Sequence, residues 1–146
     1  MVPSGYYAVL STDDEGNVLV RFPQHPSVNT FGRDEDEAEE MAREALNLAL
    51  EADFDRGLRL PASRKPRVGH GEHIVLVPLD AEVRMAYVLR MWREEAGLTQ
   101  QELASRLGVS YQAYQRMERP GRSNLTVTTL DRIARALNRE LVIAVQ

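Results

Sequence analysis

The segment from residue 98 to residue 118 constrains the fold more than any other part of the sequence. Thr99 is followed three residues later by Glu102, which is the spacing of a capping box at the start of a helix. Gly108 tolerates the backbone of a tight turn, and Ser110 can cap a second helix. The apolar residues at helical spacing are Leu103, Ala104, Leu107, Val109 and Met117. The pattern predicts two short helices that cross closely and are joined by a tight turn.

The polar residues of this segment occupy helix positions other than those of its apolar side. Gln and Arg side chains can read adenine or guanine edges with two hydrogen bonds, and the first turns of such a second helix enter the major groove. The segment closely resembles the helix-turn-helix of Xre-type, lambda-repressor-like transcription factors. The resemblance implies that DNA is bound by Gln100, Ser110, Tyr111, Gln112, Gln115, Arg116, Arg119 and Arg122. We expect Tyr114 to be mostly buried with its hydroxyl at the rim. The alternative is a helical bundle that only packs.

The residues around this segment extend the helical half. A helix is expected over residues 82–96, ended by Gly97, and another begins at Thr126 or Thr128. The tail over residues 140–145 is expected to be a strand. An unpaired apolar strand invites aggregation, so pairing with a second copy is expected to form a homodimer or a higher homo-oligomer. The alternative is that the tail packs on its own helices. The candidate dimerisation residues are Leu141, Val142, Ile143 and Val145.

The first half of the chain has a different order of elements. Strands are expected over residues 6–12 and 17–22, with a turn at 13–16, followed by an extended passage through Pro23 and Pro26. A helix is expected to begin at the cap Asp34, with Glu37 reaching back. Its stripe of mostly small residues, suited to close packing on a sheet, is Ala38, Met41, Ala42, Ala45, Leu46 and Ala49. A loop over residues 61–72 and a strand over 73–79 complete this half.

This order, with the aromatic hairpin, the Pro-x-x-Pro segment and the Ala- and Leu-rich helix, resembles HicB, the antitoxin of HicA–HicB toxin–antitoxin pairs. The resemblance implies a truncated ribonuclease-H-like fold and binding of a HicA-like toxin, a small ribonuclease. Charge and exposure nominate toxin contacts around residues 23–30 and 34–40, among them Gln24, His25, Asp34, Glu35 and Glu37.

Charge is divided between the two halves. Residues 1–80 have a balance of −7, and residues 81–146 have a balance of +3. A negative half can complement a basic partner, while a positive half can meet DNA. The division can also be surface variation without a function.

Catalysis, metals and membranes find no support in the sequence. The chain has no cysteine, so thiolate metal sites and thiol nucleophiles are excluded. Two-metal chemistry needs converging carboxylates, but the acidic residues here lie in the turn 13–15 and at the helix start 34–40. His25, His70 and His73 match no metal or triad template. Apolar runs such as 74–79 are far shorter than the roughly 18 residues that a bilayer requires, and no signal peptide is recognised. We expect a cytoplasmic protein without enzymatic activity or cofactors.

Together these features predict an α+β protein. Its first domain, residues 1–80, is a HicB-like sheet with a helix that binds a toxin. Its second domain, residues 81–146, is an all-α helix-turn-helix with a C-terminal strand that binds operator DNA and dimerises. The expected function is an antitoxin that neutralises a HicA-like mRNA-cleaving toxin and represses its own operon. The main alternative is a stand-alone Xre-type regulator whose first domain senses a small ligand, and a more distant one is a nuclease.

Overall fold

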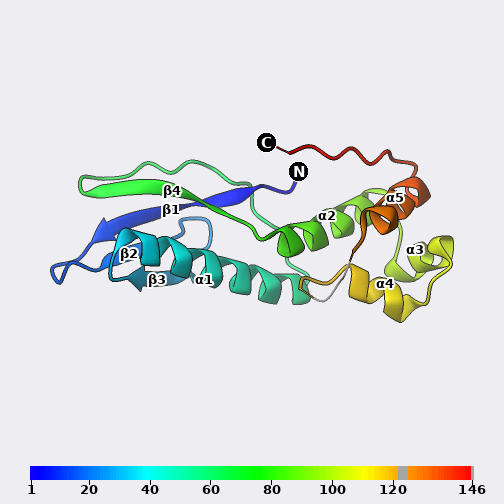
Figure 1. The fold of residues 1–146 in the computed structure, drawn as a ribbon, viewed down its shortest axis with the longest axis horizontal. Helices are drawn as coiled ribbons and strands as arrows, with labels where there is room; N and C mark the ends of the chain where they lie inside the picture. The colour runs from blue at the N-terminus through cyan, green and yellow to red at the C-terminus, as the bar shows by residue number, and fades with distance from the viewer. Residues whose placement is uncertain (122–124, 146) are drawn as a thin grey trace. The chain divides into compact units, whose positions relative to one another are not determined.

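The computed structural model describes residues 1–121 and 125–145, and it divides into two compact units, residues 1–84 and 85–146. Figure 1 shows a sheet with one long helix in the first unit and a group of short helices in the second. Both classes of element occur in the halves where the sequence predicts them, so the predicted α+β class is confirmed. In the described parts of the chain, no helix combines the length and apolarity needed to cross a bilayer.

The sheet of the first unit is antiparallel, with the strand order β3-β2-β1-β4. Asp13 closes the β1–β2 hairpin by accepting the backbone N–H of Glu15 at 2.9 Å and that of Asn17 at 2.8 Å. Gly16 has a φ of 89°, a left-handed value that suits glycine in this turn. The strands are β1 (Gly5–Thr12), β2 (Val18–Arg21), β3 (Asn29–Gly32) and β4 (Glu72–Pro78).

Helix α1 (Glu35–Asp55) packs on one face of this sheet. Asp34 caps it by accepting the backbone N–H of Glu37 at 2.8 Å, as the sequence predicts. The carboxylate of Glu37 instead reaches the backbone N–H of Arg33. A Cβ on Gly32 would lie 2.3 Å from the backbone nitrogen of Ala38, so only glycine allows β3 to end directly against the helix start. The core joins apolar residues of both elements: Tyr6, Ala8, Leu10, Val20 and Val77 from the sheet, and Ala38, Ala42, Leu46, Leu50 and Phe54 from the helix.

The connection from α1 to β4 is an irregular loop, in agreement with the sequence prediction. Two side chains fix it to the rest of the unit. The hydroxyl of Tyr6 donates to the carbonyl of Pro61 at 2.6 Å, and the amide of Gln24 donates to the carbonyl of Arg64 at 2.7 Å.

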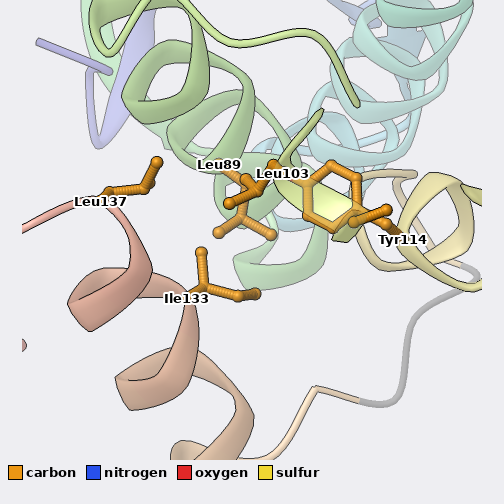
Figure 2. Packing of buried hydrophobic residues seen from close by; sticks show 6 residues of the cluster. Leu89, Leu103, Tyr114, Ile133 and Leu137 are labelled. Atoms are coloured by element: carbon orange, nitrogen blue, oxygen red, sulfur yellow. The ribbon is translucent and has the colours of Figure 1, made fainter. Parts of the chain in front are cut away.

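The second unit is formed by the later part of α2 (Ala81–Glu95) with α3 (Gln100–Leu107), α4 (Tyr111–Met117) and α5 (Val127–Ala136). Figure 2 shows that Leu89, Leu103, Tyr114 and Ile133, one from each helix, point toward one another. Ala104 and Leu137 complete the buried cluster. Thr126 caps α5 by accepting the backbone N–H of Thr129, which settles the choice between Thr126 and Thr128.

The predicted C-terminal strand is wrong for the single chain. Residues 138–145 carry no strand assignment, and the exposed side chains include Val142, Ile143 and Val145. A strand needs a hydrogen-bonded neighbour, and the described residues of the same chain offer none to this segment. The tail is therefore an extended apolar segment.

Candidate nucleic-acid interface

The helix-turn-helix geometry is built by caps that the sequence specifies locally. Thr99 accepts the backbone N–H of Glu102 at 3.1 Å, and the carboxylate of Glu102 accepts the backbone N–H of Thr99 at 2.9 Å. Gly108 ends α3 with a φ of 69°, and its N–H donates to the carbonyl of Ser105. Ser110 then caps α4 by accepting the backbone N–H of Ala113 at 3.1 Å. These bonds satisfy helix-end groups that would otherwise lack partners, and they fix the start of α4.

Helix α4 has one buried side and one solvent side. Tyr114 is fully buried, whereas Tyr111, Gln112, Gln115 and Arg116 are exposed. Their spacing of i, i+1, i+4 and i+5 places these four side chains on one face of the helix. This exposed face of α4 combines an aromatic ring, two amides and a guanidinium, which can hydrogen-bond base edges and phosphates.

The other DNA-binding candidates are Gln100, Ser110, Arg119 and Arg122. Gln100, at the start of α3, is half-buried. The Ser110 hydroxyl is used in the α4 cap, so its first role is structural. Arg119 is half-buried just after α4, and its backbone N–H donates to the carbonyl of Arg116. Arg122 lies outside the described residues.

A buried ion pair that the sequence analysis missed holds α4 against α2. Glu118 is fully buried, and its two carboxylate oxygens each accept from the Arg93 guanidinium at 2.8 Å. The third nitrogen of Arg93 donates to the carbonyl of Leu98 at 2.8 Å. The hydrogen bonds that the Arg93 guanidinium donates to the Glu118 carboxylate raise the pKa of Arg93. The spacing in the sequence could have indicated that Glu118 is buried, because Glu118 follows Tyr114 by four residues and so lies on the same face of the helix.

The Tyr114 side chain lies deeper than the sequence suggests. Its hydroxyl is buried rather than at the rim, and burial raises its pKa above the usual value for tyrosine. The hydroxyl lies close to both charges of the Arg93–Glu118 pair. The expected hydroxyl position was wrong because the ion pair gives a polar group a place inside this core.

Two arginines brace α3 against α5. Arg106 donates to the carbonyl of Ala136 at 3.3 Å, and Arg132 donates to the carbonyl of Leu107 at 2.9 Å. Because both bonds end on carbonyls at helix ends, they complement the negative end of the helix dipole. The exposed face of α4 is therefore carried by helices that are fixed to one another.

The candidate toxin contacts of the first unit differ in how far they are exposed to solvent. His25 is buried, its ring centroid lies 4.5 Å from that of Tyr6 with the two ring planes at 86°, and burial lowers the pKa of His25, so it is neutral at pH 7. The half-buried Gln24 is bonded to the 61–72 loop. Both side chains have contacts inside the unit, and their role in toxin binding stays a prediction. Asp34 is an exposed cap, Glu35 pairs with His73 at 2.9 Å, and Glu37 pairs with Arg33 at 3.0 Å.

Comparisons with known proteins match both units. Residues 5–86 match the family described as the HicB-like antitoxin of bacterial toxin–antitoxin systems, and residues 89–143 match the family described as helix-turn-helix. The chain is 30% identical to Antitoxin HicB 1 of Photorhabdus laumondii over 141 residues, which cover 97% of this chain and 86% of that protein. It is 31% identical to Antitoxin HicB of Escherichia coli K12 over 112 residues, which cover 77% of this chain and 78% of that protein. The crystal structure of the N-terminal domain of Burkholderia pseudomallei antitoxin HicB matches 51% of this chain and 96% of its own, with 21% identity and a TM-score of 0.41.

Proposed function

The chain belongs to the HicB-like antitoxin family, and from this membership we propose that it is the antitoxin of a toxin–antitoxin pair. The first unit binds and silences a HicA-like, mRNA-cleaving toxin. The second unit binds operator DNA and represses the operon that the two proteins share. The observation that carries this proposal is the joining, in one chain, of a HicB-like domain to a capped helix that presents two amides and a guanidinium on one exposed face.

The charges of the two halves support this division of tasks. The balance of −7 over residues 1–80 complements a basic RNA-binding protein, and the balance of +3 over residues 81–146 complements the DNA backbone. Both tasks are binding tasks, so we assign the chain no catalytic step and no cofactor. Because operator DNA and mRNA both lie in the bacterial cytoplasm, we expect the chain to act there.

The DNA-binding half is tested by single substitutions on the exposed face of α4. If Gln112 and Arg116 read bases, then Gln112→Ala and Arg116→Ala each cost about 1–3 kcal/mol on the operator and little on random DNA. Gln100→Ala, as the loss of a phosphate contact, weakens both equally. Fluorescence anisotropy with labelled duplexes tiled across the DNA upstream of the gene gives these affinities at fixed salt.

Matched controls come from exposed polar residues elsewhere in the second unit. Gln101→Ala removes an exposed amide of α3, and Arg135→Ala removes an exposed guanidinium of α5 that pairs with Asp131. Both should bind the operator as the unchanged chain does. Equal losses on operator and random DNA for all three test variants would reject base reading by this face.

We also propose that the tail makes the second unit a homodimer. A single helix-turn-helix seldom holds DNA tightly, and such domains bind paired half-sites about one helical turn apart. Val142, Ile143 and Val145 are exposed, with Leu141 half-buried beside them, and pairing of two tails would give these segments the strand neighbour that each lacks.

Removal of the tail tests this arrangement. A chain that ends at Arg139 is expected to have a smaller mass in solution than the full chain and to bind the operator more weakly, because two half-sites are then no longer held by one dimer. Light scattering and anisotropy measure the two effects. A shortened chain that keeps both the dimer and its operator affinity would reject tail pairing.

A further inference from the structure

The solvent side of α1 carries large apolar side chains that other described residues leave open. Leu48 is 70% exposed and Met41 is 38% exposed, and they lie two turns apart on the same side of the helix. The side of α1 that packs on the sheet holds a separate stripe of buried residues. The exposed pair is therefore not a misplaced part of the core. We name the surface formed by Met41, Glu44, Leu48 and Glu51 the α1 ridge.

The spacing of the α1 ridge is that of a helix-docking seam. Its residues follow one another at intervals of three, four and three, the heptad spacing by which one helix presents a continuous stripe to a partner. Met41 and Leu48 alternate with the carboxylates of Glu44 and Glu51 along this stripe. Exposed apolar side chains set among polar groups are a feature of protein-binding surfaces.

The carboxylates on and beside the α1 ridge are available to a binding partner. Within the part of the chain that the structure describes, no ion pair engages Glu40, Glu44 or Glu51. A surface hollow of about 420 Å³ lies beside the ridge, and it is lined by Glu40, Arg43, Glu44, Asp80, Ala81 and Glu82. Arg43 is already paired with Asp80 at 2.6 Å. The hollow therefore keeps a negative excess that suits a lysine or arginine side chain.

A second copy of this chain is a poor occupant of the α1 ridge. Two copies packed along the same seam would bring Glu44 and Glu51 of one helix close to the same residues of the other, and like charges facing each other are destabilising. The complementary occupant is a basic protein surface with an apolar recess for Leu48 and cationic side chains on both sides.

We propose that the α1 ridge is the docking surface for the basic toxin, with Leu48 and Met41 as the apolar anchors and Glu44 and Glu51, together with Glu40 of the adjacent hollow, as the steering charges. This inference rests on the proposed antitoxin function. It moves the main contact from Gln24, His25 and residues 34–37, where most side chains are engaged inside the unit, to the middle of α1. Buried apolar anchors carry most binding energy at such interfaces, and rim charges mainly set the association rate.

The test measures binding of the full chain to the short basic protein encoded beside it, by surface plasmon resonance. Met41→Ala with Leu48→Ala should weaken the complex about tenfold or more, mainly through faster dissociation. Glu44→Lys with Glu51→Lys should slow association about tenfold or more and reduce its dependence on salt. Alanine and lysine are good helix formers, so α1 is expected to stay folded, and thermal melting by circular dichroism checks this.

Two controls alter matched residues elsewhere in the first unit. Leu76→Thr replaces a half-exposed apolar residue of β4, and Glu15→Lys reverses an exposed charge in the hairpin turn. Binding by the unchanged chain together with equal binding by ridge and control variants would overturn the ridge while leaving the antitoxin proposal intact. No binding by the unchanged chain would overturn both. Loss of self-association in the Met41/Leu48 variant, seen by sedimentation, would assign the ridge to a second copy and reject the proposal.

Discussion

Replacing Glu118 with alanine is expected to destabilise the second unit by about 3–5 kcal/mol, because it leaves the Arg93 charge buried without its partner. Arg93 keeps only 13% of its side-chain surface exposed, and Glu118 keeps none. The three hydrogen bonds of Arg93, two to Glu118 and one to Leu98, have little water to replace them. Since Glu118 is also the residue that ends α4, the loss should loosen the helix proposed to read DNA.

The sequence supplies a convenient probe of this loss. Trp92 is the only tryptophan, and it packs against the core of the second unit. Urea unfolding of the full chain followed by its fluorescence therefore reports this unit. Asp131→Ala is the matched control, because it breaks an exposed pair with Arg135 and should cost no more than about 0.5 kcal/mol.

A double substitution distinguishes the effect of leaving a charge unpaired from the effect of losing side-chain volume. Arg93→Met with Glu118→Leu removes both charges and keeps similar volume, so it is expected to recover most of the stability lost in Glu118→Ala. A loss below about 1 kcal/mol for Glu118→Ala would contradict the view that this pair holds α4 in place.

The sequence predicted the helix ends and the turn that depend on interactions between residues close together in the chain. The caps Asp34, Thr99 and Ser110 and the turn glycine Gly108 each act within four residues, and each has its expected role in the structure. The exposed face of α4 follows from the same local rule, because its spacing and its buried neighbour Tyr114 are both visible in the sequence.

The parts that were missed depend on contacts between distant residues. β3 has only four residues and no alternation of its own, and its identity comes from pairing with β2. The Arg93–Glu118 pair joins residues 25 positions apart, and charged side chains are ordinarily expected at the surface. The tail has the composition of a strand but no strand neighbour among the residues that the structure describes, so its expected strand did not form. Charge and exposure nominated His25 as a toxin contact; its packing on Tyr6 buries it, so the exposure argument does not hold for His25, and its role in toxin binding stays a prediction.

The largest functional effect is expected on RNA cleavage by the toxin. Antitoxin binding with a Kd near 1 nM, within the range of specific protein complexes, leaves on the order of 1% of the toxin free when the antitoxin is in excess by about 100 nM. Cleavage should then fall about a hundredfold. The Gln112→Ala and Arg116→Ala variants should silence the toxin as well as the unchanged chain does, because those residues belong to the second unit.

The most direct measurement is therefore the rate at which the purified toxin encoded beside this chain cleaves a labelled RNA as the full chain is added. The account predicts a fall to background once the chain exceeds the toxin, with no effect on an unrelated ribonuclease used as the control. Cleavage that continues at an unchanged rate in a large excess of folded chain would contradict the account and favour a stand-alone regulator whose first unit senses a small ligand.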